Sequence, residues 1–150
     1  MNDRELLELA ARAAGNGCTW CEFWETMARP LNDGSGWDNR ATWNPRKDDG
    51  DALRLAVTRG LVVTPDRENQ RTLVSNQAGH EYCAIYWDKL GEMAATRLAI
   101  TEAAAEIGKS MGGGGVSPFW NGVLKGYMKT MLAGLPTVFL ILLALSHISS

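Results

Sequence analysis

The chain has 150 residues, of which 45% are hydrophobic and 21% are charged, a composition typical of one globular domain with an appendage. Residues 1–111 carry 13 basic and 17 acidic side chains, a net charge of −4, whereas residues 116–150 carry two basic and no acidic ones. This acidity argues against nucleic acid as a partner, because phosphate backbones require a basic surface. The charged N-terminus lacks the apolar core of a secretory signal, which predicts that the chain starts in the cytoplasm.

The first predicted element is an amphipathic helix that ends at Gly15. Asn2 can cap this helix, with Glu5 three residues further on, and apolar residues then recur at helical spacing. Residues 18–25 are rich in Trp and Phe, which predicts a strand. Residues 30–44 are rich in Asn, Asp, Gly and Ser, which predicts an ordered or semi-ordered loop.

A second helix is predicted after Pro45 and up to Gly60. Asp48 or Asp49 can accept hydrogen bonds from the amides of its first turn, where acids also favour the positive end of the helix dipole. This capping role is preferred over a cation-binding loop, because the acids lack the spacing of a calcium loop. The predicted buried stripe consists of Ala52, Leu53, Ala56 and Val57.

Short strands are predicted at residues 61–64, 72–75 and 80–87, where β-branched or alternating apolar residues lie between polar turns. From residue 90 to 111 the apolar spacing becomes helical, which predicts a long third helix. Its predicted buried face consists of Met93, Thr96, Ile100, Ala103, Ala104, Ile107 and Met111. This order predicts an α+β fold: a small antiparallel sheet of three to four strands with the N-terminal, central and long C-terminal helices on one face.

Residues 43–57, with the sequence WNPRKDDGDALRLAV, and residues 94–100 and 103–108 resemble a group of small uncharacterised proteins of tailed bacteriophages and prophages. The resemblance covers about residues 1–111. It implies a phage accessory protein that acts in a bacterial host, and it implies no activity. Members of the group usually stop near the position of Met111, so the C-terminal segment of this chain departs from their pattern.

The three cysteines, together with His80, form the one group of side chains that could bind a metal or take part in a reaction. Cys18 and Cys21, together with His80 and Cys83, make two pairs spaced by two residues, and they supply the three thiolates and one imidazole of a closed structural zinc site. An odd number of cysteines favours free thiols or metal ligands over disulfides in a reducing compartment. Two alternatives to zinc stay open: Cys21 and Cys83 as small core residues with His80 in a turn and no cofactor, or a redox dithiol at Cys18 and Cys21.

The C-terminal segment is predicted in three parts. A glycine-rich linker at residues 112–117 is followed by an amphipathic interfacial helix at 118–133, with Lys125 and Lys129 on its polar side. Residues 135–148 are predicted to form an apolar helix, which is a candidate membrane anchor. The residues predicted to contact the membrane are Phe119, Trp120, Val123, Leu124, Tyr127, Met128, Leu135, Val138, Phe139, Leu140, Ile141, Leu142, Leu143 and Leu145.

The length of the apolar segment is just sufficient for a membrane span. Residues 131–148 carry no formal charge and would extend about 27 Å as a helix, against a hydrocarbon core of about 30 Å. The lysines before this segment would keep residues 1–111 on the cytoplasmic side. The alternative is a helix that packs on the domain or at an oligomer interface, because the most apolar part, residues 135–145, is short and contains Pro136.

The leading functional hypothesis is a phage-encoded, non-enzymatic accessory protein at the inner face of the host cytoplasmic membrane. Its acidic domain would meet a host or phage protein in superinfection exclusion, envelope interference or lysis. The alternative is a soluble interaction or regulatory module with a structural zinc ion, whose C-terminal segment forms homo-oligomers. No enzyme is predicted, because no nucleophile with its base, phosphate loop or pair of catalytic carboxylates stands in a recognisable frame.

Overall fold

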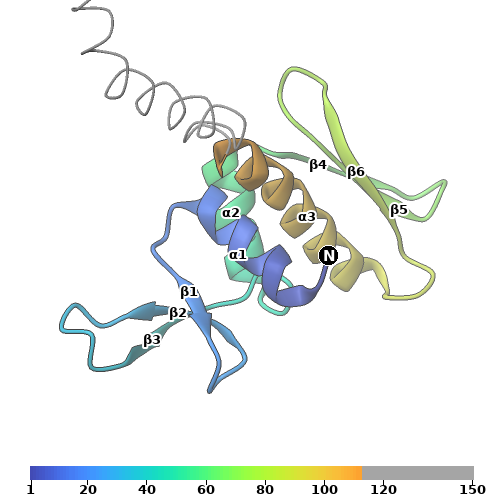
Figure 1. Ribbon diagram of the computed structural model, residues 1–150. Helices are drawn as coiled ribbons and strands as arrows, with labels where there is room; N and C mark the ends of the chain where they lie inside the picture. The colour runs from blue at the N-terminus through green and yellow to red at the C-terminus, as the bar shows by residue number, and fades with distance from the viewer. Residues whose placement is uncertain (113–150) are drawn as a thin grey trace, which may run out of the picture. The chain divides into compact units, whose positions relative to one another are not determined.

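The computed structural model describes residues 1–112, which form three helices and six strands (Figure 1). The elements are α1 (Asp3–Ala14), β1 (Thr19–Cys21), β2 (Thr26–Pro30), β3 (Trp37–Trp43), α2 (Asp49–Arg59), β4 (Val62–Asp66), β5 (Arg71–Ser75), β6 (Glu81–Tyr86) and α3 (Glu92–Gly112). The predicted α+β class is confirmed for this part of the chain. The interfacial helix, the anchor and their predicted membrane contacts lie outside the described residues.

The strands form two separate antiparallel sheets of three strands, in the orders β1-β2-β3 and β4-β5-β6. Figure 1 shows the helices gathered at the centre, with α3 between the pair α1 and α2 and the sheet of β4 to β6. The sheet of β1 to β3 lies at one end of α1 and α2. The prediction of a single sheet with helices on one face is therefore wrong, since the helices lie between two small sheets.

The first sheet departs most from the predicted elements. Residues 18–25 contain β1 and then a turn that leads into β2, and residues 30–44, predicted as a loop, contain β3. The interior of β3 is polar and largely exposed, so it lacks the apolar alternation that marks a strand. Backbone pairing with β2, in which Met27 lies opposite Trp43, stabilises it instead.

The ends of α1 and α2 confirm the predicted signals. Asn2 caps α1 by accepting a hydrogen bond from the backbone N–H of Glu5 at 2.8 Å, and Asp48 caps α2 in the same way from Asp51 at 2.7 Å. The C-terminal caps are Gly15 and Gly60, with φ of 63° and 62°. These are left-handed conformations that glycine adopts without strain, which is why both helices end there.

The buried faces of α2 and α3 were predicted in part correctly. On α2, Ala52 and Ala56 are buried as expected, but Leu55 is buried in place of Leu53 and Val57, which are 65% and 73% exposed. The helix has apolar residues on two faces, and only tertiary packing chooses between them. The smaller stripe, with one leucine and two alanines, faces the core.

Small residues make α3 the central helix of the domain. Ile100, Ala103 and Ala104 are buried as predicted, whereas Met93 and Met111 are 58% and 43% exposed. The remaining buried positions of α3 are Ala95, Ala99, Thr101, Ala105 and Gly108. A helix with such a small-residue surface can be contacted closely on several sides, which large methionines would prevent.

The core of residues 1–112 combines side chains of the helices and of both sheets. Each layer contributes a buried member, such as Leu7 from α1, Met27 from β2, Leu55 from α2, Val74 from β5 and Ile100 from α3. Residues of both sheets therefore meet one set of helices in one apolar cluster. Within this part of the chain, none of the helices combines the length and apolarity that a membrane crossing requires.

Candidate functional site

The structure places the predicted zinc ligands in two different sheets. Cys18 precedes β1 and Cys21 ends it, whereas His80 precedes β6 and Cys83 lies within it. Across residues 1–112, no group of three or more His, Cys, Asp or Glu side chains is arranged to hold a metal ion. The two pairs are therefore not assembled into one ligand set. The zinc site stays a prediction, which a measurement of the metal content can test.

The thiols have other partners in the fold. The Sγ atom of Cys83 donates a hydrogen bond to the carbonyl oxygen of Ala99 at 3.2 Å, and burial, aided by nearby acids, raises the pKa of this thiol to about 12. Cys21 is 1% exposed and belongs to the core. A thiol that stays protonated is a poor metal ligand and a poor nucleophile, so Cys83 fits a structural role.

His80 lies in the turn between β5 and β6. Its backbone N–H donates to Oδ1 of Asn76 at 2.9 Å, and its ring makes an edge contact with the ring of Tyr82 at 5.1 Å between centroids. These interactions fix the turn that joins the two strands. The position agrees with the alternative in which His80 is a turn residue.

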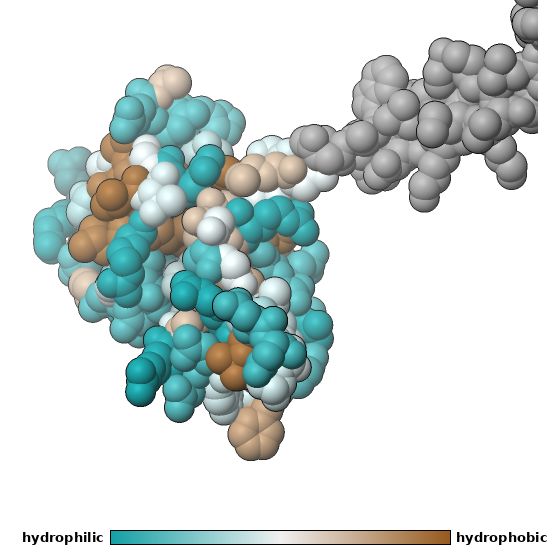
Figure 2. Space-filling view, turned by 90° about the vertical axis from the view of Figure 1, so that its left-hand side faces the viewer, coloured by the Kyte–Doolittle hydropathy of each residue, from teal (hydrophilic) through white to brown (hydrophobic). Residues whose placement is uncertain are grey.

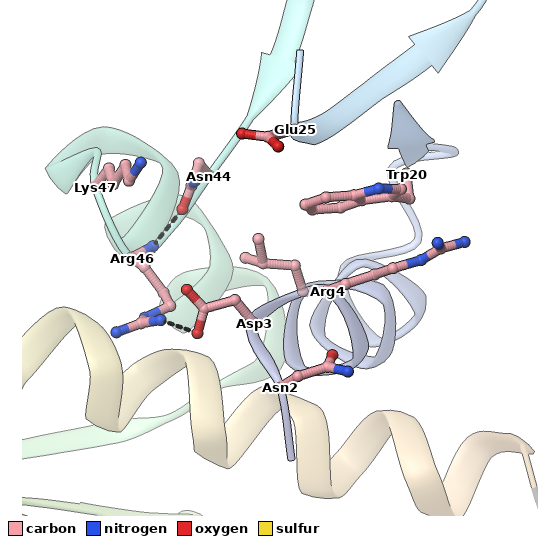
Figure 3. A pocket seen from close by; sticks show the side chains of 9 residues that line it. Asn2, Asp3, Arg4, Trp20, Glu25, Asn44, Arg46 and Lys47 are labelled. Carbon is pink, nitrogen blue, oxygen red and sulfur yellow. Dashed lines mark hydrogen bonds and ion pairs between the residues drawn. The ribbon is translucent and has the colours of Figure 1, made fainter. Parts of the chain in front are cut away.

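A cavity of about 530 Å³ with a mixed polar and apolar lining lies beside Trp20, and it is here called the Trp20 cavity (Figure 3). It lies between the start of α1, β1 and the segment that leads into α2. Arg4 lies under the indole ring of Trp20, with its guanidinium carbon 5.8 Å from the ring centroid. The cavity is lined by Asn2, Asp3, Arg4, Leu7, Trp20, Glu25, Asn44, Arg46 and Lys47.

Most charges of the Trp20 cavity already have partners. Arg4 forms ion pairs with Glu8 at 3.2 Å and Glu22 at 2.6 Å, and Arg46 pairs with Asp3. Among residues 1–112, Glu25 and Lys47 form no ion pair. The uncommitted charges are thus one acid and one base, which gives no preference for an anion or a cation.

Two buried N–H groups beside the Trp20 cavity lack acceptors, namely Nε1 of Trp20 and Nε of Arg46. Either could donate to a bound polar group. The nine lining residues include no Cys, His, Ser or Thr, and their charged members are Asp3, Arg4, Glu25, Arg46 and Lys47.

An apolar area on the outside of the domain was not predicted from the sequence. Leu53 and Val57 lie one turn apart on α2 and are 65% and 73% exposed. Figure 2 views the side away from the sheet of β4 to β6 and shows apolar side chains gathered in one area of a mostly hydrophilic face. Gathered apolar surface of this kind is typical of an interaction site.

The comparisons with known proteins show no family for this chain. No family model matches the sequence, and no curated protein or solved structure matches it. The resemblance to phage proteins therefore stays a prediction.

Proposed function

We propose that this protein is a phage-encoded, non-enzymatic accessory protein that residues 113–150 hold at the inner face of the host cytoplasmic membrane. The domain of residues 1–112 then presents its surface to a host or phage protein. One observation carries the proposal: the helices and both sheets of residues 1–112 share one apolar core, while the remaining sequence contains a long apolar segment without acids. Superinfection exclusion, envelope interference and lysis are the processes that such a placement suits.

The apolar segment needs surroundings that water does not provide. Residues 135–145 include eight Leu, Ile, Val or Phe side chains, and each contributes about −0.3 to −0.6 kcal/mol on the membrane insertion scale. The sum is roughly −2 to −5 kcal/mol before the cost of Pro136. Lys125 and Lys129 precede the segment and favour a cytoplasmic domain.

The outer face of α2 supports a protein partner for the domain. Leu53 and Val57 are the two most exposed aliphatic side chains of the core-forming helices, and burying such a side chain contributes roughly 1.5–3 kcal/mol. Arg54, between them in sequence, is 71% exposed and can add a charged contact at the rim. A partner with an apolar groove bordered by acids would fit this face.

Membrane fractionation tests the proposal. Full-length protein should sediment with membranes and stay there in high salt, while a chain that lacks residues 116–150 should be soluble. Ile141→Arg, in the middle of the apolar segment, should weaken membrane retention because a central arginine costs about 2.5–3.5 kcal/mol. Ser149→Arg is the matched control, since it adds the same charge beyond the segment. Full-length protein in the soluble fraction would refute the membrane assignment.

The second candidate function is a soluble module that self-associates, and the exposed α2 residues favour it as well. In that case, full-length protein would be soluble and oligomeric. Leu53→Ser with Val57→Ser would then lower the sedimentation coefficient, and the same double substitution would leave the membrane fraction unchanged under the first proposal.

A further inference from the structure

A second cavity, of about 300 Å³, lies where the end of α1 meets β2, β3 and α2, and it is here called the Arg29 cavity. Trp43 and Leu55, which are 8% and 2% exposed, supply its apolar wall. None of its ten lining residues is Asp or Glu, so it gathers hydrogen-bond donors without carboxylates. Its polar lining consists of Asn16, Cys18, Arg29, Thr42, Arg54 and Thr58.

Arg29 brings to this cavity a positive charge that no carboxylate of residues 1–112 neutralises. It lies opposite Asp38 in the register of β2 and β3, yet neither that residue nor any other in this part of the chain forms an ion pair with it. Asp38 instead accepts a hydrogen bond from the backbone N–H of Arg40 at 2.9 Å. Burial raises the pKa of Cys18, and Arg29 is close enough to that thiol to oppose the rise.

Asn16 adds a donor that is already oriented. Its Oδ1 atom accepts a hydrogen bond from the backbone N–H of Cys18 at 3.0 Å, which fixes the side-chain amide. The Nδ2 atom on the other side of this amide is buried and has no acceptor. A buried N–H without an acceptor costs free energy, and an oxygen atom bound in the cavity would remove that cost.

Arg54 supplies a second guanidinium at the open side of the cavity. Its Nη2 atom donates to Asp51 at 2.8 Å and lies 4.0 Å from the carboxylate of Asp48, and the remaining N–H groups of this 71% exposed side chain stay available. Asp51 lies close enough to the cavity for its negative charge to raise the pKa of Cys18. Both of its oxygens are occupied, by Arg54 and by the backbone N–H of Asn44.

We propose that the Arg29 cavity binds a phosphate monoester group. Guanidinium forks match the geometry of phosphate oxygens, and the three terminal oxygens of a phosphate accept more hydrogen bonds than the two of a carboxylate. Arg29, Asn16 and the hydroxyls of Thr42 and Thr58 can supply that many donors. The group can belong to a free phosphorylated compound or to a lipid headgroup, since both present the same oxygens.

Alkylation of Cys18 responds to occupancy of the cavity, because this thiol lines it while Cys83 does not. Cys18 also lines a neighbouring cavity beside Arg12 and Trp20, so variants must assign the protection to the Arg29 cavity. The rate of Cys18 alkylation by iodoacetamide is measured on the full-length protein by mass spectrometry. One series adds inorganic phosphate at constant ionic strength with chloride as the balancing anion. The other adds phosphatidylcholine vesicles with or without phosphatidate. A ligand present at about ten times its Kd should slow the reaction about ten-fold.

Variants connect the protection to the cavity. Arg29→Gln and Asn16→Asp should abolish it, the second because a carboxylate oxygen replaces the donor while Oδ1 still accepts from Cys18. Arg40→Gln and Asn39→Asp are matched controls that make the same charge changes at exposed positions of β3 outside the cavity. Arg29→Lys should retain part of the protection. An unchanged alkylation rate of Cys83 in every variant shows that each one is folded.

Each outcome of these experiments either supports or overturns the phosphate proposal. Protection by inorganic phosphate supports a free phosphorylated ligand, and protection by phosphatidate vesicles alone supports a lipid headgroup. Protection by neither, or equal behaviour of Arg29→Gln and Arg40→Gln, overturns the proposal. The result is independent of the membrane assignment, because the phosphate series needs no membrane.

Discussion

Replacing Gly108 with alanine should destabilise the domain, although alanine is the better helix former. A Cβ atom on Gly108 would lie 2.0 Å from the carbonyl oxygen of Leu9 and 2.8 Å from its carbonyl carbon. Both atoms belong to the backbone of α1, so no side-chain rotation can relieve the overlap. Arg12 also joins the two helices here, since its Nη1 donates to the carbonyl oxygen of Gly108 at 3.4 Å.

The size of the effect follows from two opposing terms. Cβ atoms in proteins keep at least 3.0 Å from such neighbours, so α1 and α3 would have to move apart by about 1 Å. Overpacking of this kind costs about 1–3 kcal/mol, and a shift of two whole helices belongs near the upper end. The gain in helix propensity is about 1 kcal/mol. A net loss of about 2 kcal/mol should lower the urea midpoint by about 1 M, for a slope near 2 kcal/mol/M.

Gly50→Ala is the matched control for helix propensity. A Cβ there would meet Oδ1 of Asp48 at 3.1 Å and a guanidinium nitrogen of Arg54 at 3.2 Å, so these side-chain ends need to shift by only a few tenths of an ångström, which the N-cap and the ion pair can accommodate. Its stability should therefore stay within about 1 kcal/mol of the wild type. Urea unfolding followed by tryptophan fluorescence compares the two variants. If Gly108→Ala proves as stable as Gly50→Ala, the close contact between α1 and α3 is wrong.

Four further predictions concern helix α2, Cys83 and the metal content. Leu55→Ala should lower the free energy of unfolding by about 2–5 kcal/mol and Leu53→Ala by less than about 0.5 kcal/mol in urea unfolding, and equal losses would contradict the orientation of α2. Asp48→Ala should cost about 1 kcal/mol in the same measurement by removing the N-cap of α2, whereas Asp48→Asn should keep most of it. Because burial raises the pKa of Cys83 to about 12, its thiol should stay largely protonated and unreactive towards iodoacetamide at the pH where a free cysteine reacts. Purified protein should contain far less than one zinc per chain by elemental analysis, and a full equivalent that Cys18→Ser and Cys83→Ser both remove would instead establish the zinc site.

The ends of the helices could be predicted because their signals are local. Asn2 and Asp48 act on amides three residues away, and Gly15 and Gly60 act through their own φ. None of these effects depends on where the rest of the chain lies. The strands of the second sheet were found for a similar reason, since β-branched or alternating residues between polar turns mark them locally.

The packing of the helices could not be predicted, because it depends on contacts between distant segments. Leu53 and Leu55 are equally apolar, and only the position of α1 and α3 decides which of them is buried. The same holds for β3, whose polar sequence becomes a strand because β2 pairs with it. Periodicity reports an apolar face, but it cannot rank two faces of one helix.

The Arg29 cavity also has no signal in the sequence. Its polar residues come from the turn after α1, from β2 and β3, and from α2, so no spacing along the chain unites them. The cysteine pairs have regular spacing, and yet the fold separates them into two sheets. Spacing along the chain is informative only where all the ligands lie on one short segment. Neither the polar residues of the Arg29 cavity nor the two cysteine pairs do so.

Helix α2 connects the two surfaces to which we assign binding. Leu53 and Val57 are exposed on it, and Arg54 and Thr58, the next residues along the chain, line the Arg29 cavity. A protein partner that covers the two apolar side chains must therefore approach the guanidinium of Arg54. A phosphate bound in the cavity would reduce the positive charge there, and so weaken a partner whose rim is acidic. Ligand and partner should then bind antagonistically, by the same factor in either order of addition.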